Sequence, residues 1–311
     1  MRFLAGRVIN AVLVVCGVTI LTFVILRVVP GDPARLMVPP GSSEDVVENI
    51  RVELGTDKPL LTQFVDFARD TLRGDLGNSF RKDESVVALI AQTFPNTLVL
   101  TLTSVLTALA VAVPLGVQAA RRPGGVIDRI ALAVSVALQS MPSFWLGVLL
   151  VYAFAVRNRV FPAIGMDGLG SLVLPTITLA TGLMAVLTRT IRESMLSAFE
   201  SDYVRAAIAK GLSARRITWI HAAKNASIPT ITVLGIQIGF VLGGTFVVEL
   251  IFNWPGTGLL ALQAIQQRDF PVVQGVVMVV AISFVLVNLL VDVMYAVLDP
   301  RVRVGNRNGS R

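Results

Sequence analysis

Long apolar runs dominate the pattern of hydrophobic and polar positions along this chain. A helix needs about 20 apolar residues to cross the hydrocarbon core of a bilayer. Runs of that length predict membrane-spanning helices, and none of them alternates with the two-residue period of a barrel strand. The six predicted spans are residues 8–29, 97–120, 129–156, 172–191, 230–252 and 272–298.

The composition agrees with a membrane protein. Of the 311 residues 54% are hydrophobic and 15% are charged, whereas soluble domains are about one quarter charged. The first apolar run is longer than the core of a signal peptide, and no small-x-small cleavage site follows it, so we interpret it as a retained helix. The predicted fold class is therefore an all-α integral membrane protein.

The basic character of the chain follows from its predicted topology. The net charge is +7 and the pI about 10.3, which could indicate nucleic-acid binding. With the N-terminus placed in the cytoplasm, more than half of the 27 Lys and Arg residues fall in inner segments, where they outnumber the acids. This positive-inside bias predicts that both termini are cytoplasmic, and it explains the pI without nucleic acid.

The only sizeable extramembrane segment follows the first span. Pro59 can open a helix near residues 60–72, with Phe64 and Phe67 on one face. A further helix near residues 83–93 is expected to precede the second span. The segment is too short for a separate catalytic domain. We therefore divide the chain into residues 1–94 (first span and extracytoplasmic helical loop), 95–300 (five-helix core with a cytoplasmic loop at about 193–228) and 301–311 (cytoplasmic tail).

A structured basic segment joins the fourth and fifth spans. It reads DYVRAAIAKGLSARRITWIHAAKNASIP, residues 202–229. Asp202 is a good N-cap, and Gly211 can end the first helix in a left-handed conformation. Ser213 can cap a second helix, and Pro229 can open the fifth span. The pattern predicts a helix, a glycine turn and a helix, presented by two membrane helices.

The surface of this segment suits a docking role. The small side chains of Ala206 and Ala207 would let a partner approach closely, and basic residues would add charge complementarity. The alternative is a solvated basic segment that holds anionic lipid at the membrane surface. The basic residues are Arg205, Lys210, Arg215 and Arg216.

The segment resembles the EAA coupling loop of permease subunits in binding-protein-dependent ABC importers. That pattern is E-A-A, three residues and Gly; here Arg205 replaces the Glu, and Ala206, Ala207 and Gly211 follow at the right spacing. This departure and the exit HAAKNASIP are similar to the dipeptide/oligopeptide/nickel branch, in particular its B-type subunit. Nearly the whole chain takes part, through LRVVPGDP, RGDLGNSF, FNWPGTGLLALQAIQQRDFPVVQG and VNLLVDVMYAVLDPRVR.

The resemblance implies a type I ABC importer permease fold in the bacterial inner membrane. It implies alternating access driven by an ATPase, most simply for di- or oligopeptides, with nickel or another small solute as the alternative. The implied partners are a second permease subunit, one or two ATP-binding subunits and an extracytoplasmic solute-binding protein. The implied coupling residues are Tyr203, Arg205, Ala206, Ala207, Lys210, Gly211, Leu212 and Ser213.

The chain carries no sign of its own catalysis. It has no Gly-Lys pair, so the phosphate-binding GxxxxGK[ST] loop is absent. ATP and Mg are therefore expected in partner subunits, with no cofactor here. Cys16 and His221 are the only residues of their types, which argues against a metal cluster or a Cys-His pair. A stand-alone channel and an intramembrane enzyme are remote alternatives.

Polar residues within the spans are candidates for the pathway or its gate. Glu249 lies near the end of the fifth span, and membrane acids are functional candidates, although it could simply pair with a neighbour. Helix breakers at membrane depth must face protein or a cavity, which makes the polar kink of the third span a candidate too, unless it is only a kink. The kink consists of Gln139, Ser140, Met141, Pro142 and Ser143.

Two further patterns predict contacts between helices. Gly235, Gly239 and Gly243 recur every four residues in the fifth span, which indicates close helix packing or, alternatively, a smooth pathway-lining face. Asn288 and Asp292 are four residues apart in the last span, where they can form hydrogen bonds across helices.

Overall fold

The computed structural model describes residues 2–28, 34–35, 38, 41–53 and 55–298. Within these ranges the regular elements are helices, apart from an isolated antiparallel bridge between Asn78 and Ser85. Residue 29 of the first predicted span and the predicted tail, 301–311, lie outside the described residues. Contacts divide the chain into two compact units, residues 1–96 with 255–285 and residues 97–254 with the chain from 286 onward. The predicted sequential division at residues 94 and 300 stays a prediction.

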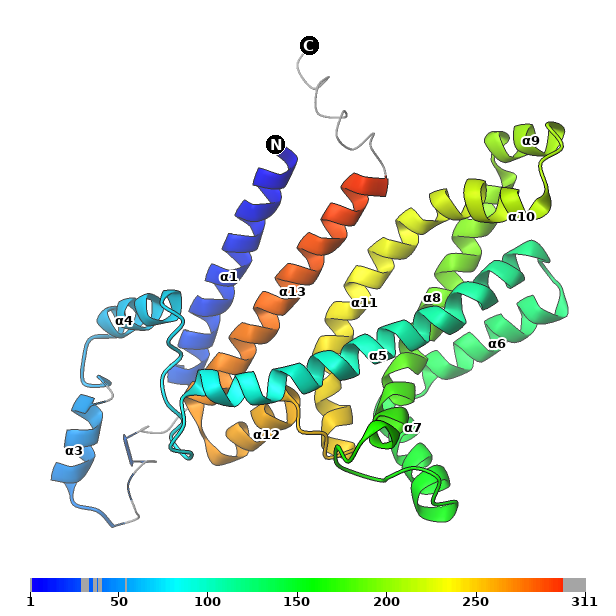
Figure 1. The fold of residues 1–311 in the computed structure, drawn as a ribbon. Coiled ribbons are helices and arrows are strands. Elements are labelled where there is room, and N and C mark those ends of the chain that lie inside the picture. The colour runs from blue at the N-terminus through cyan, green and yellow to red at the C-terminus, as the bar shows by residue number, and fades with distance from the viewer. Residues whose placement is uncertain (1, 29–33, 36–37, 39–40, 54, 299–311) are drawn as a thin grey trace. The chain divides into compact units, whose positions relative to one another are not determined.

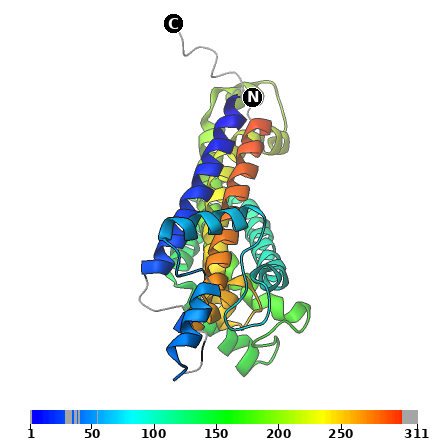
Figure 2. The same ribbon diagram turned by 90° about the vertical axis from the view of Figure 1, so that its left-hand side faces the viewer.

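The first unit combines N-terminal helices with two segments from late in the chain. Its helices are α1 (Arg2–Val28), α3 (Glu44–Glu53), α4 (Leu60–Leu72), the start of α5 (Val86–Arg121), α12 (Thr257–Gln267) and the first part of α13 (Phe270–Leu298). α1 runs beside α13 (Figure 1, Figure 2), and the Thr19 hydroxyl donates to the Met278 sulfur at 3.5 Å. The predicted apolar face of α4 packs on α1, where the ring of Phe23 lies 5.2 Å from Phe64 and 5.8 Å from Phe67.

A buried carboxylate joins distant parts of this unit. Asp269, between α12 and α13, accepts hydrogen bonds from the hydroxyl of Ser79, 190 positions away, and from the backbone N–H of Phe80 at 3.1 Å. The guanidinium of Arg81 donates to the carbonyl of Gln267 at 3.1 Å. These bonds hold the loop that precedes α5 against the end of α12.

The second unit is built around α8. Its elements are the rest of α5, α6 (Val126–Ser140), α7 (Ser143–Leu150), the π-helix η1 (Val151–Arg157), α8 (Leu169–Glu200), α9 (Asp202–Ala209), α10 (Ala214–Arg216), the π-helix η2 (Ile217–Ala222), α11 (Ala223–Ile251) and the end of α13. α8 contacts α6, α7 and α11. Its apolar stretch is 56% buried, against at most 33% for the other long apolar helices, which identifies it as the central helix.

The described helices support several membrane crossings. Four are long and apolar enough to span a bilayer: Val86–Arg121, Leu169–Glu200, Ala214–Ile251 and Phe270–Met294. The third predicted span is not one straight helix, because α6 and the α7–η1 helix meet at a bend of 99°. α1 contains a shorter apolar stretch, Ile9–Val24. Six spans with cytoplasmic termini stay a prediction.

Three predicted helix boundaries are wrong. The helix expected near residues 83–93 is the start of α5, which continues through Pro95, and Pro229 lies inside α11 instead of opening it. A proline removes a single helical hydrogen bond, and neighbouring helices allow the helix to continue. Asp202 is the first residue of α9, because Ser201 takes the extended N-cap conformation and its carbonyl accepts from the N–H of Val204 at 3.1 Å.

Candidate functional site

The segment between α8 and α11 folds as a compact elbow, which we define as residues 201–222. α9 ends at a turn in which Gly211 has φ +73°, a left-handed conformation that glycine adopts without steric cost. The hydroxyl of Ser213 then accepts a hydrogen bond from the N–H of Arg216, as predicted for the cap of the second helix. From Ala214 the helical chain continues without a break to Ile251.

The elbow has a small core of its own. Val204 and Ala207 of α9 are buried against Ile217 of η2, and Leu212 packs on the same cluster. Ala206 is exposed, because neighbouring residues on a helix point about 100° apart. The predicted Ala206–Ala207 face is therefore divided: Ala207 holds the elbow together, and Ala206 is available to a partner.

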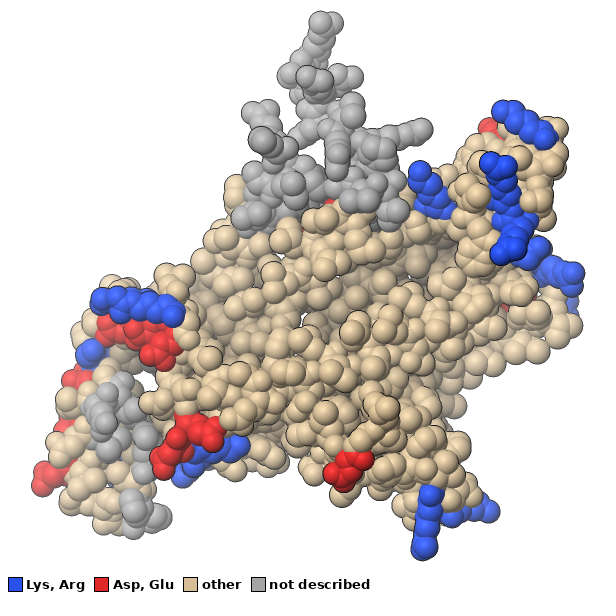
Figure 3. Space-filling model, in the orientation of Figure 1, with Lys and Arg blue, Asp and Glu red and all other residues tan. Residues whose placement is uncertain are grey.

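The outer surface of the elbow is basic. On the face seen in Figure 3, Lys and Arg side chains gather over α9 and α10. Arg205 lies 3.6 Å from the carboxylate of Asp202, but both side chains are largely exposed, so this pair contributes little to stability. Tyr203 is 40% exposed on the same helix. Of the other predicted coupling and basic residues of the elbow, Leu212 is half-buried. The exposed ones are Lys210, Gly211, Ser213, Arg215 and Arg216.

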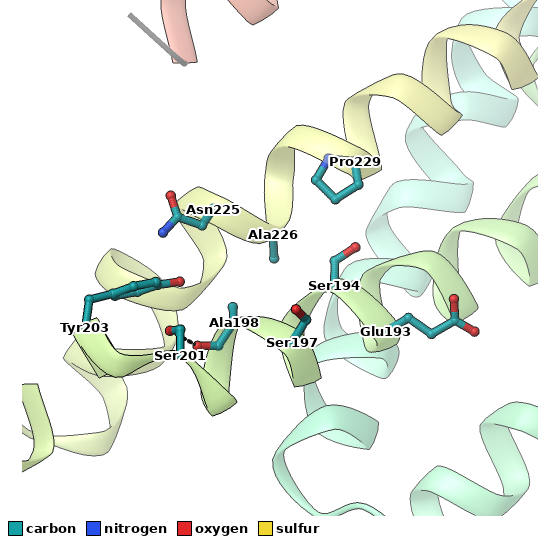
Figure 4. A pocket seen from close by; sticks show the side chains of 9 residues that line it. All are labelled: Glu193, Ser194, Ser197, Ala198, Ser201, Tyr203, Asn225, Ala226 and Pro229. Atoms are coloured by element: carbon teal, nitrogen blue, oxygen red, sulfur yellow. Dashed lines mark hydrogen bonds between the residues drawn. The ribbon is translucent and has the colours of Figure 1, made fainter. Parts of the chain in front are cut away.

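A groove of about 430 Å³ lies between the end of α8 and the start of α11, beside the elbow (Figure 4). Tyr203 is its only contribution from α9. Hydroxyl, amide and carboxylate groups line the groove, so it can exchange hydrogen bonds with water or with a side chain from a partner. The full lining is Glu193, Ser194, Ser197, Ala198, Ser201, Tyr203, Asn225, Ala226 and Pro229.

An ion pair that no local sequence pattern predicts anchors α6 to α8. The guanidinium of Arg192 donates to both carboxylate oxygens of Asp128, at 2.9 Å for Nη2–Oδ2, and the N–H of Gly124 donates to the same carboxylate at 2.8 Å. Asp128 is buried. The two residues are 64 positions apart, and the only available sequence signal was a charged residue at the end of each predicted span.

The helix break at residues 139–143 falls where the sequence predicts it. Met141 is extended, with φ −89° and ψ +123°, and Pro142 precedes the first residue of α7. Gln139 accepts a hydrogen bond from Arg189 of α8 at 3.1 Å, while the hydroxyl of Ser140 donates to its own helix. All five residues, Ser143 included, are exposed on this chain. Their role in a pathway stays a prediction.

Glu249 is fully enclosed by the chain. Its side chain is 0% exposed and accepts a hydrogen bond from the hydroxyl of Thr97 on α5 at 2.7 Å. Its chain neighbour Val248 belongs to an apolar cluster that also includes Leu100, Phe252 and Trp254. Glu249 thus joins α11 to α5, and the predicted gating role is not tested by this contact.

The three glycines spaced four residues apart in α11 have different surroundings. A Cβ on Gly235 would lie 2.5 Å from Cγ2 of Val291, whereas a Cβ on Gly243 would have nothing within 4 Å. Gly235 therefore packs tightly against α13, whereas Gly243 is exposed. Gly239, which lies between them in the sequence, is half-buried. On α13, Asn288 is half-buried and Asp292 is buried, close to Val291 along the helix.

Comparison with known proteins defines the class of this fold. Two solved structures of the methionine ABC transporter MetNI, in inward facing conformations, match 68% of this chain and 96% of theirs with TM-scores of 0.54 and 0.56. Their sequences are 17% and 19% identical to this one, so this likeness concerns the fold alone. The fold is that of a type I importer permease.

The family follows from the sequence itself. Residues 112–304 match the binding-protein-dependent transport system inner membrane component family, and residues 1–101 match the N-terminal part of such components. The chain therefore belongs to this family, and it is a multi-pass inner membrane permease of the ABC transporter type.

Curated relatives match along the full length. The chain is 38% identical over 309 residues to the probable peptide ABC transporter permease protein y4tP of Sinorhizobium fredii (strain NGR234), covering 97% of this chain and 99% of that one. It is 37% identical over 303 residues to the glutathione transport system permease protein GsiC of Escherichia coli (strain K12), with the same coverage.

Proposed function

We propose that this chain is a permease subunit of an importer for di- or oligopeptides, and that an ATPase subunit drives it through the elbow. The cargo class is supported by the names of two relatives that match from end to end, one a peptide permease and one a glutathione permease. Glutathione is itself a small peptide. Selection of the individual peptide belongs to the solute-binding protein, which delivers the cargo to the permease.

The observation that carries the coupling role is the construction of the elbow. Its own core, around Val204 and Ala207, keeps α9 folded as a protruding block. From Ala214 to Ile251 one helical path of 38 residues leads away from that block. Because a helix transmits displacement along its axis, a partner that grips α9 moves α11 as well. The gripping face is Tyr203, Arg205 and Ala206.

The proposed complex contains four kinds of subunit. They are this permease, a second permease, one or two ATP-binding subunits and an extracytoplasmic solute-binding protein. ATP and Mg are held by the ATP-binding subunits, and this chain contributes movement of its helices between inward-facing and outward-facing states. The proposed topology has six spans, with the N- and C-termini and the elbow in the cytoplasm.

Site-directed cross-linking tests the coupling role. In a variant with Cys16 replaced by Ser, a cysteine at Ala206 is expected to cross-link to the ATP-binding subunit in the purified complex. A cysteine at Leu72, which is 88% exposed on α4, is the control and is expected to give no such product. Cross-linking of neither or of both positions would contradict the proposal. Uptake of labelled dipeptides and of nickel by the same complex tests the cargo class.

A further inference from the structure

A shallow groove of about 490 Å³ follows the outer face of α10 and η2. It is lined by Ser213, Arg215, Arg216, Trp219 and Ile220. All five residues are exposed, and the exposed fractions of Trp219 and Ile220 are 51% and 56%. Two guanidinium groups thus lie next to two large apolar side chains on one outward face.

This face points away from the rest of the elbow. Ile217, Thr218 and Ala222 of the same helix are buried, at 7%, 3% and 0% exposure. Ile217 packs on Val204 and Ala207, and no residue of α9 lines the groove. The groove therefore uses other residues than the face of α9 formed by Tyr203, Arg205 and Ala206.

The groove has the chemistry of a membrane–water interface. It lies at the start of the helix Ala214–Ile251, which leads into the predicted fifth span at residues 230–252. Tryptophan is enriched at such interfaces, and arginine can keep its head near phosphate while its stem covers apolar surface. The sequence from 203 to 248 contains no Asp or Glu, so no carboxylate of this segment offsets the charges of Arg215 and Arg216.

We propose that the groove binds an anionic phospholipid. Arg215 and Arg216 hold the headgroup phosphate through charge-assisted hydrogen bonds, and Trp219 and Ile220 lie along the first part of an acyl chain. The elbow would then have one face on the ATPase and the other on the lipid surface. This inference rests on the membrane location of the family, and it uses the proposed function only for the partner on α9.

Lipid binding to the purified transporter complex, followed by native mass spectrometry, tests this site. The wild-type complex is expected to retain phosphatidylglycerol in preference to phosphatidylcholine. R215Q/R216Q is expected to bind phosphatidylglycerol about 30-fold more weakly, which corresponds to about 1 kcal/mol for each arginine near an anionic surface. R215K/R216K keeps the charge and is expected to keep most of the binding, which guards against a loss due to misfolding.

The matched control is R121Q/R122Q, which removes an adjacent pair of exposed arginines at the end of α5. It is expected to leave phosphatidylglycerol binding unchanged. Equal retention of the two lipids, or equal weakening by both double variants, would overturn the proposal. If glycerol phosphate bound as tightly as phosphatidylglycerol and displaced it, the groove would be a site for free anions, and the proposal would be overturned as well.

Co-purification of the ATP-binding subunit, measured on the same samples, separates this inference from the proposed function. Loss of the ATPase subunit from R215Q/R216Q with lipid selectivity intact would make the groove an ATPase contact and would refute the lipid site. Selective lipid binding by a wild-type preparation that never retains an ATPase would support the lipid site and refute the coupling role instead.

Discussion

A carboxylate inside an apolar helix is costly unless hydrogen bonds compensate it. Glu249 is completely buried in α11, and the hydroxyl of Thr97 donates to it at 2.7 Å. The bond connects residues 152 positions apart, so the polarity of both residues serves the contact between α5 and α11. Glu249 is recognisable in the sequence as a candidate for function, whereas Thr97 is not, because it is one of many threonines in the spans.

We expect Thr97→Val to destabilise the protein. The substitution keeps the shape and removes the donor, and a buried acceptor that loses its donor costs about 1–3 kcal/mol. The thermal midpoint of the detergent-solubilised protein should fall clearly for Thr97→Val and change little for Thr97→Ser, which keeps the hydroxyl. Equal midpoints for the two variants would show that the Thr97–Glu249 hydrogen bond is unimportant.

We expect Gly235→Ala to destabilise the protein and Gly243→Ala to leave its stability nearly unchanged. A methyl group at Gly235 would lie 2.5 Å from Val291, whereas at Gly243 it would meet nothing within 4 Å. Overpacking of this kind costs about 1–3 kcal/mol. The thermal stability of the solubilised variants measures the difference. Adding Val291→Ala should restore the stability of the Gly235→Ala variant, because it makes room for the new methyl group. A Gly243→Ala variant as unstable as Gly235→Ala would refute the packing argument.

At the scale of the element, the elbow was largely predictable. Helix formers, Gly211 and the capping Ser213 are local signals, and the structure has the helix, the turn and the cap where these signals place them. The side on which each alanine lies was not predictable, since Ala206 and Ala207 have the same chemistry and no periodic pattern separates them. Only the contact of Ala207 with Ile217 decides it.

That difference gives the two alanines different mutational outcomes. Ala207→Glu would bury a charge in the core of the elbow, so we expect loss of coupled ATP hydrolysis together with faster trypsin cleavage at Arg205 and Lys210. Ala206→Glu would lose coupling and keep the protease resistance, because its side chain is exposed. Cleavage kinetics and cargo-stimulated ATP hydrolysis are the two measurements. Rapid cleavage of Ala206→Glu would mean that this position, too, supports the fold of the elbow.

At the scale of the whole molecule, hydropathy predicts the helices well, but it predicts neither the contacts between distant segments nor the angles at which helices bend. The long apolar helices follow from length and composition, which are local properties. The pairs Asp128–Arg192 and Ser79–Asp269 connect residues 64 and 190 positions apart, and a single sequence holds no record of such pairings. The same limit applies to the 99° bend, since a polar stretch with a proline indicates a break without giving its angle.

The orientation of the whole chain depends on that bent pair. If α6 and the α7–η1 helix cross the membrane as one broken span, residues 122 and 166 lie on opposite sides, and six spans leave both termini in the cytoplasm. If the pair instead forms a re-entrant loop that returns to the side from which it entered the membrane, the two residues lie on the same side. The chain then has five spans, and its termini face opposite compartments. The basic residues of the elbow, among them Arg205, Lys210 and Arg215, favour the first arrangement through the positive-inside rule, because the second arrangement would place them outside.

Cysteine labelling in intact cells distinguishes these arrangements. Single cysteines at Arg122, Met166 and Lys210, all exposed, are introduced after replacement of Cys16 by Ser. With an impermeant maleimide we expect only Met166→Cys to react from outside, while Arg122→Cys and Lys210→Cys react after the cells are opened. Protection of both Arg122→Cys and Met166→Cys in intact cells would identify a re-entrant pair. It would also place Lys210 outside, because α8 then carries the chain across, and the elbow could no longer reach a cytoplasmic ATPase.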